Sequence, residues 1–248
     1  MLELRCQING RPLIVGHRGA MAVAPENTFP AFEAGCAGGA DILELDVQLT
    51  SDGKVIVFHD TDLFYKTGFP GRVCDHSAHF LRNLDVGSHF DDDFAGLQMP
   101  FLEEVLDWAN GRVNLMIELK HGANVFDAAL DKATVELIED FRMVNDVILT
   151  SFDQFALQRV KQMNPNIATS FIYITRVRNP LQMVEGLDLH ALSPATDYLT
   201  YEEVKLIQNA GYACSPGGFW WDYEVLDKWG VDTISSNDPS TIRLPIKG

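Results

Sequence analysis

The stretch "ILELDVQLTSDGKVIVFHD", residues 42–60, decides how the strands of this chain are counted. It holds two apolar, strand-like runs, and Asp52-Gly53 lies between them. An Asp-Gly pair in this position is a strong signal for a two-residue β-hairpin. We therefore expect residues 55–58 to fold back along residues 42–50 as an antiparallel arm rather than to form a separate parallel strand.

Outside this hairpin, short apolar runs alternate with amphipathic stretches almost from end to end. Strands are expected at residues 13–16, 42–47, 113–118, 147–150, 168–173, 189–193, 211–214 and 231–235. Helices are expected at residues 28–38, 100–110, 124–141, 153–163, 179–186, 200–210 and 222–229. Once the return arm of the hairpin is set aside, eight parallel strands remain. This alternation predicts an α/β protein, a (β/α)8 TIM barrel with a small inserted segment after the second-strand hairpin.

One domain is expected for the whole chain, residues 1–248. Hydrophobic residues make up 46% and charged residues 22%, an ordinary globular composition with enough apolar mass for one large core. Residues 60–98 are the exception to the alternation, because they are rich in Gly, Asp, His and Phe and show weak periodicity. A segment of this length inside a compact domain is usually functional or forms a small subdomain.

The charge balance restricts the partners. The formal net charge is −16, from 35 acidic and 19 basic side chains, which opposes binding to nucleic acid or to an anionic membrane surface. No apolar run approaches the ~20 residues that span a bilayer, and the first residues lack the apolar core of a signal peptide. The four cysteines are scattered, without a CxxC pair. We expect a cytoplasmic protein with a small-molecule partner and no stable membrane insertion; its oligomeric state is open, a homo-oligomer included.

Three acidic side chains are predicted to meet at one end of the barrel. Glu44 and Asp46 lie two apart on the expected strand 42–47 and so point to the same side, while Glu118 ends the strand 113–118. Residues at the carboxyl ends of barrel strands converge on one rim. Three carboxylates buried there need a cation, because an unpaired buried charge is very costly. An all-oxygen set suits one hard divalent ion, Mg²⁺ or Ca²⁺.

Two histidines and two basic side chains follow the same strands. His17 and Arg18 come after strand 13–16, and Lys120 follows Glu118. If Asp52 and Gly53 are the two loop residues, the hairpin places His59 opposite Asp46, about 5 Å away at Cβ. Arg18 and Lys120 then supply positive charge for a phosphate. His17 and His59 can divide the acid and base roles across one phosphorus atom. A lone histidine after a strand is more often structural, and this reading is kept for His76, His79, His89, His121 and His190.

Several blocks of the sequence resemble the glycerophosphodiester phosphodiesterase family. They are "GHRGAMAVAPENT", "GGADILELDVQLTSDGKVIVFHD", "MPFLEEVLDWA" and "LMIELK", with weaker likeness in "LTSFDQFALQRVKQMNP" and "GVDTISSNDP". The resemblance implies a (β/α)8 barrel that uses a divalent cation to hydrolyse glycerophosphodiesters to glycerol 3-phosphate and an alcohol, within lipid and glycerol metabolism. It implies His17 and His59 as the acid/base pair, Glu44, Asp46 and Glu118 as metal ligands, and Arg18 and Lys120 as phosphate contacts. It also implies that residues 60–98 form a small inserted subdomain over the barrel mouth.

One segment departs from the family pattern and leaves the alcohol open. In "CSPGGFWWDYE", Gly217 and Trp220 stand where the family commonly has Trp and Asn at the end of the seventh strand. An alternative enzyme is a lysophospholipase D-type phosphodiesterase, which needs an apolar channel. Aromatic residues of the inserted segment are candidates for it: Phe64, Tyr65, Phe69, Phe80, Phe90 and Phe94. A third reading, from another class, is an inactive barrel that acts as a binding module.

Overall fold

The computed structural model describes residues 1–8, 10–121, 128–218 and 222–244. Its strands are Leu13–Gly16 (β1), Ile42–Leu49 (β2), Val55–Val57 (β3), Asn114–Leu119 (β4), Val147–Ser151 (β5), Ala168–Tyr173 (β6), Ala191–Pro194 (β7), Ala213–Cys214 (β8) and Thr233–Ser236 (β9). Its helices are Phe29–Ala37 (α1), Phe64–Thr67 (α2), Ala78–Arg82 (α3), Leu102–Ala109 (α4), Ala129–Asp140 (α5), Gln154–Met163 (α6), Pro180–Met183 (α7), Tyr201–Asn209 (α8) and Tyr223–Trp229 (α9).

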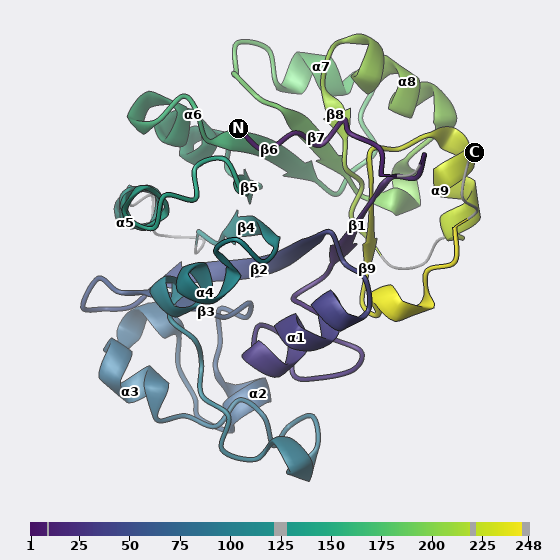
Figure 1. The fold of residues 1–248 in the computed structure, drawn as a ribbon. Helices are drawn as coiled ribbons and strands as arrows, with labels where there is room; N and C mark the ends of the chain where they lie inside the picture. The colour runs from purple at the N-terminus through teal and green to yellow at the C-terminus, as the bar shows by residue number, and fades with distance from the viewer. Residues whose placement is uncertain (9, 122–127, 219–221, 245–248) are drawn as a thin grey trace.

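The strands form a nearly closed parallel barrel, as predicted. Their order is β8-β7-β6-β5-β4-β2-β1-β9, and β3 pairs only with β2, in the antiparallel sense. The first and last strands of this path are joined through Asp232, whose backbone N–H donates to the carbonyl of Cys214 over 2.9 Å. Figure 1 shows the helices α1, α4, α5, α6, α8 and α9 around the strands. The (β/α)8 expectation is therefore confirmed.

The hairpin is present, but its predicted register is wrong by one residue. Val47 pairs with Val57, and the backbone N–H of Thr50 donates to the carbonyl of Lys54 over 2.9 Å, so the loop has three residues rather than two. Gly53 lies in the left-handed region at φ 80°, as three-residue loops require. The shift places Phe58, and not His59, opposite Asp46: the N–H of Phe58 donates to the carbonyl of Asp46 over 3.0 Å.

Strand alternation divides the barrel into an outer and an inner surface. On β2, Leu43, Leu45 and Val47 face outward and pack against the helices, whereas Ile42 faces inward. The inward-facing residues near the amino ends of the strands are apolar and form a separate cluster that includes Leu2 and Leu4 of the N-terminal segment. Near the carboxyl ends the interior becomes polar, with Glu44 and Asp46 on β2. The barrel interior is therefore filled by apolar side chains near the amino ends of the strands and by polar side chains near their carboxyl ends.

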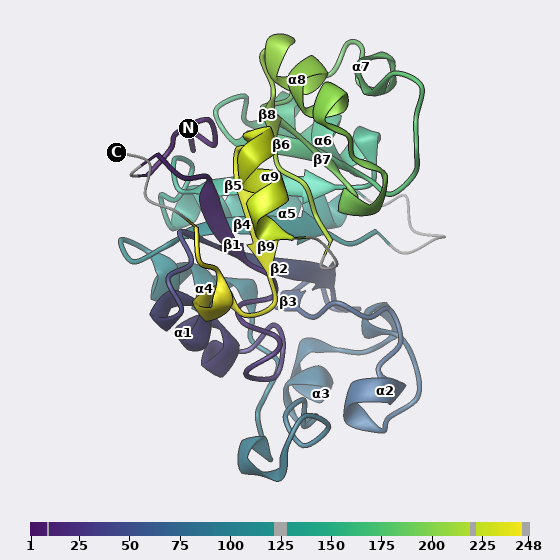
Figure 2. The ribbon, with the colours of Figure 1, turned by 90° about the vertical axis from the view of Figure 1, so that its right-hand side faces the viewer.

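The inserted segment between β3 and α4 packs around a small core of its own. That core holds Ile56, Phe58, Leu63, Val73, Leu81, Val86 and Met99. Figures 1 and 2 both show α2 and α3 lying away from the barrel strands, on the side of β2 and β3. The expected helix over 179–186 forms only the single turn of α7, and Gly186 has a φ of 82°, a conformation that a helix cannot continue.

Candidate functional site

A cavity of about 560 Å³ opens at the carboxyl ends of the barrel strands. Six of the seven residues singled out in the sequence line it, and they come from segments after β1, on β2, after β3 and at the end of β4: His17, Arg18, Glu44, His59, Glu118 and Lys120. The seventh, Asp46, is 1% exposed and contacts the cavity-lining Arg18 and Lys120. The structure therefore brings these seven residues together at one place, as the sequence predicted.

The three acids form one compact group. Oxygen atoms of Glu44, Asp46 and Glu118 lie within 4.8 Å of one another. Burial and the neighbouring Asp46 raise the pKa of Glu44 well above its usual value, and they also raise the pKa of Glu118. Burial alone would raise the pKa of Asp46 too, but Arg18 and Lys120 outweigh it and lower that pKa. The acids thus form a crowded, oxygen-only cluster that could hold a hard metal ion.

Asp46 is held by an asparagine from the turn that precedes α1. The side-chain amide of Asn27 donates to Oδ2 of Asp46 over 2.9 Å, and the backbone N–H of Asp46 donates to Oδ1 of Asn27 over 3.1 Å. Asn27 has a φ of 59°, in the left-handed region that Asn adopts more readily than most residues. The Pro-Glu-Asn-Thr turn therefore brings an amide into contact with Asp46 and fixes the orientation of this carboxylate.

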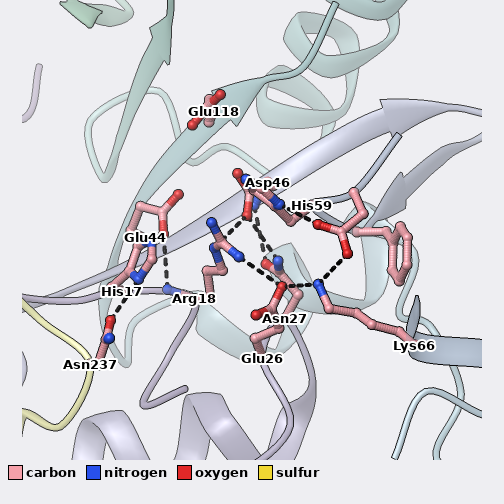
Figure 3. Close-up of polar contacts among 12 residues, drawn as sticks. His17, Arg18, Glu26, Asn27, Glu44, Asp46, His59, Lys66, Glu118 and Asn237 are labelled. Carbon is pink, nitrogen blue, oxygen red and sulfur yellow. Dashed lines mark hydrogen bonds and ion pairs between the residues drawn. The ribbon is translucent and has the colours of Figure 1, made fainter. Parts of the chain in front are cut away.

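The two basic residues, Arg18 and Lys120, both contact acidic side chains of the site. Nη1 of Arg18 lies 2.9 Å from Oε1 of Glu26, and its Nε lies 3.4 Å from Oδ2 of Asp46. Nζ of Lys120 lies 2.9 Å from Oε1 of Glu118 and 3.6 Å from Oδ1 of Asp46. Both cations therefore border the cavity while being oriented by carboxylates, and Figure 3 shows these contacts for Arg18.

The imidazole of His17 is oriented by a neutral amide. Its Nδ1–H donates to Oδ1 of Asn237 over 2.8 Å, and its Nε2 lies 3.9 Å from Oε2 of Glu44. Burial and the positive charge of Arg18 lower the pKa of His17 to about 4. At neutral pH the ring is therefore uncharged, with Nε2 able to accept a proton. Asn237 comes from the "SSNDP" tail after β9, and a polar residue directly after a barrel strand was the signal that could have identified it.

The imidazole of His59 is oriented by a carboxylate. Its Nδ1–H donates to Oδ1 of Asp60 over 2.7 Å, so Nε2 is the nitrogen left for chemistry. His59 reaches the cavity although it does not face Asp46 in the ladder, because the chain leaves the sheet after Val57 and strand alternation no longer applies. The adjacent "HD" pair was the available signal for Asp60.

Apolar and aromatic side chains also line the cavity. They include Phe152, Ile172, Ile174 and Tyr198, of which Ile174 is 65% exposed, and Asp197 is a further charged residue of the lining. None of the aromatic residues of the inserted segment that were candidates for an apolar channel is among the lining residues. Gly217 and Gly218 of the segment that departs from the family pattern also line the cavity, whereas Trp220 and Trp221 lie outside the described residues.

No helix in the described ranges is long and apolar enough to cross a membrane. Among those residues, Cys6, Cys36, Cys74 and Cys214 are all free thiols.

Known proteins of one family match nearly the whole chain. The model of the glycerophosphoryl diester phosphodiesterase family matches residues 17–241. A glycerophosphodiester phosphodiesterase of Caldanaerobacter subterraneus subsp. tengcongensis is 32% identical over 96% of this chain and 99% of its own. One from Bacillus subtilis is 31% identical over 96% and 87%. A phosphodiesterase of Oleispira antarctica, solved with the product sn-glycerol-3-phosphate, superposes with a TM-score of 0.86 at 26% identity and covers 93% of this chain and 94% of its own.

Proposed function

Because the chain belongs to the glycerophosphoryl diester phosphodiesterase family, we propose that it hydrolyses glycerophosphodiesters to sn-glycerol 3-phosphate and an alcohol. The family resemblance and the barrel expected from the sequence are both confirmed. One observation carries the proposal: a single cavity joins a cluster of three carboxylates, two oriented imidazoles and two cations. This is the set of groups that phosphodiester cleavage requires.

The acid cluster fits one divalent cation, and we propose Mg²⁺ or Ca²⁺. The raised pKa values of Glu44 and Glu118 show that negative charge is crowded in this cluster, so a bound cation would stabilise it. A donor set made only of oxygen atoms suits a hard ion. Glu44, Asp46 and Glu118 would hold it. When bound, such an ion supplies positive charge that polarises a phosphoryl oxygen and stabilises the charge that develops on the phosphate.

The two histidines are suited to different proton transfers. His17 is neutral at pH 7 and lines the cavity, so we assign it the general base that accepts the proton of the attacking hydroxyl. His59 donates from Nδ1 to the Asp60 carboxylate, which fixes the orientation of its ring, so we assign it the complementary role, the acid that protonates the leaving alkoxide. Arg18 and Lys120 would bind the phosphate oxygens, and the buried carboxylates beside them keep their side chains directed at the cavity rim.

Metal affinity should weaken as the pH falls. A protonated carboxyl group does not bind a cation, and Glu44 and Glu118 have raised pKa values in the metal-free site. Lowering the pH from 7.5 to 5.5 therefore protonates a larger fraction of these groups, and the dissociation constant for Mg²⁺ or Ca²⁺ should rise on the order of tenfold. Calorimetric titration in buffers of different ionisation enthalpy should detect protons released on binding at pH 5.5. Binding that releases no protons and has the same affinity at both pH values would contradict this site.

The function is tested by direct turnover of candidate substrates. We expect purified protein with Mg²⁺ or Ca²⁺ to release glycerol 3-phosphate from glycerophosphocholine and glycerophosphoethanolamine. The exposed apolar wall of Phe152, Ile174 and Tyr198 supports a second candidate, a lysophospholipase D-type activity, because such a wall could contact an acyl chain. A higher kcat/KM for a lysophospholipid than for glycerophosphocholine would favour this alternative. No turnover of either class, in a folded and metal-loaded protein, would favour an inactive binding module.

We further propose that the enzyme works in the cytoplasm as part of lipid and glycerol metabolism. The net charge of −16 and the four scattered cysteines are in keeping with this location. The arrangement of the whole chain as one domain, with residues 60–98 as a subdomain over the barrel mouth, remains a prediction.

A further inference from the structure

The short helix α2 of the inserted segment has its charged residue turned inward and its aromatic residues turned outward. Phe64 is 55% exposed and Tyr65 is 84% exposed, whereas the side chain of Lys66 is only 12% exposed. Lysine is rarely buried without a partner, because removing an ammonium group from water is costly. This inverted pattern indicates that the position of the Lys66 ammonium is stabilised by specific contacts.

Those contacts are two carboxylates from different parts of the chain. Nζ of Lys66 forms an ion pair with Oε1 of Glu26 and lies 2.9 Å from Oδ2 of Asp60. It also lies 5.3 Å from the centre of the Phe58 ring, a cation–π contact. Glu26 is as buried as Lys66, with a side chain that is 10% exposed. The ammonium therefore joins the turn before α1 to the segment that follows β3.

Each of these carboxylates orients one group that borders the cavity. Oε1 of Glu26 accepts from Nη1 of Arg18 over 2.9 Å, and Oδ1 of Asp60 accepts from Nδ1 of His59 over 2.7 Å. Figure 3 shows the resulting chain of contacts, which runs from Arg18 through Glu26, Lys66 and Asp60 to His59. Lys66 lies at its centre and does not line the cavity itself.

We propose that Lys66 is a positioning residue, which holds Glu26 and Asp60 together and thereby sets the orientation of Arg18 and His59 in the site. The inference rests on the proposed function because that function gives Arg18 and His59 their roles. The contacts of Lys66 themselves do not depend on it. This role of Lys66 also gives the inserted segment a part in catalysis. Leu63, three residues before Lys66, is fully buried in the core of that segment, so its folding places the ammonium.

Electrostatics gives the reason why the lysine is needed. Ligand atoms of Glu26, His59 and Asp60 lie within 4.8 Å of one another, so the two carboxylates would repel each other without a cation between them. The hydrogen bond from His59 and the contacts with Lys66 together hold the pKa of Asp60 well below its usual value. His59 also interacts electrostatically with Asp46 and Glu118, and His89 of the inserted segment interacts with Lys66, Glu26 and Asp60. Loss of the ammonium therefore makes the surroundings of His59 more negative.

The test is the variant Lys66→Met, which keeps the length and the apolar stem of the side chain but removes its charge. We expect kcat to fall by about 10- to 100-fold, as for other residues that orient catalytic groups. We also expect the pH–rate profile to change, because removal of the ammonium leaves the two carboxylates beside the site without their shared cation. Lys66→Arg should retain activity within about threefold, since a guanidinium can contact both carboxylates.

The matched control is Lys54→Met. Lys54 is in the same part of the chain, is 57% exposed and pairs with Glu103 away from the site, so its loss should leave kcat and the pH profile unchanged. The ring resonances of the histidines give a readout by NMR that needs no activity: the signals of His59 should shift in Lys66→Met and keep their positions in Lys54→Met. Unchanged ring signals of His59 together with an unchanged kcat in a folded Lys66→Met variant would overturn the proposal. Inactivity of the unmodified protein on every glycerophosphodiester, with the His59 shift present, would instead reject the proposed function alone.

Discussion

Replacing His17 with alanine is expected to lower kcat by about 10²- to 10⁴-fold, because a general base contributes on this scale. The structure gives the physical reason for a large effect. The ring of His17 is held by Asn237 and kept neutral by burial and by Arg18, and alanine leaves no group at that place to accept a proton. Steady-state kinetics at saturating divalent ion measures the effect, and calorimetric titration with the ion checks that the acid cluster still binds it.

His79 offers the matched control for this experiment. It is an exposed histidine on α3 of the inserted segment, and His79→Ala should leave kcat unchanged. Unaltered turnover in a folded His17→Ala variant would discard the acid/base assignment. A loss of activity that follows the loss of folded protein, as judged by thermal unfolding, would likewise speak against a catalytic role.

Removal of the divalent ion is expected to have an effect of similar or larger size. Without it, the charge that develops on the phosphate lacks its main stabilisation, which is worth several kcal/mol, or about 10²- to 10⁴-fold in rate. Treatment with a chelator should therefore lower kcat by at least about 10²-fold, and added Mg²⁺ or Ca²⁺ should restore it. The ion that restores activity at the lower concentration is the better candidate for the native one.

Variants of the acid cluster connect this loss to the proposed ligands. Glu118→Gln keeps the size of the side chain but weakens one ligand, so the ion concentration needed for half-maximal activity should rise about 10- to 100-fold. Asp140→Asn, which removes an exposed charge at the end of α5, serves as the control and should leave that concentration unchanged. Full turnover by a protein shown by elemental analysis to be free of divalent ions would rule out the metal role.

Local patterns were enough to find the barrel and most of the acidic, basic and histidine side chains that line its cavity. A strand alternates with a period of two, so Glu44 and Asp46 had to share one face, and Glu118 pairs with Asp46 in the register of β2 with β4. The convergence of strand ends in a barrel then brought residues from four segments together without any long-range contact being known. The hairpin was also predicted correctly, although Gly53 in a three-residue loop shifted its register by one position.

Contacts made by loops could not be found in this way, because no periodic rule governs where a loop returns. Asn237 meets His17 across 220 residues of sequence, and Lys66 meets Glu26 across 40. Each pair depends on the paths of two irregular segments and on which buried charges must be neutralised. The same holds for the inserted segment: its aromatic residues suggested an apolar channel, but the folded chain lines the cavity with Phe152 and Tyr198 instead. Short-range periodicity is encoded in neighbouring residues, whereas the pairing of buried charges is settled only when distant segments pack together.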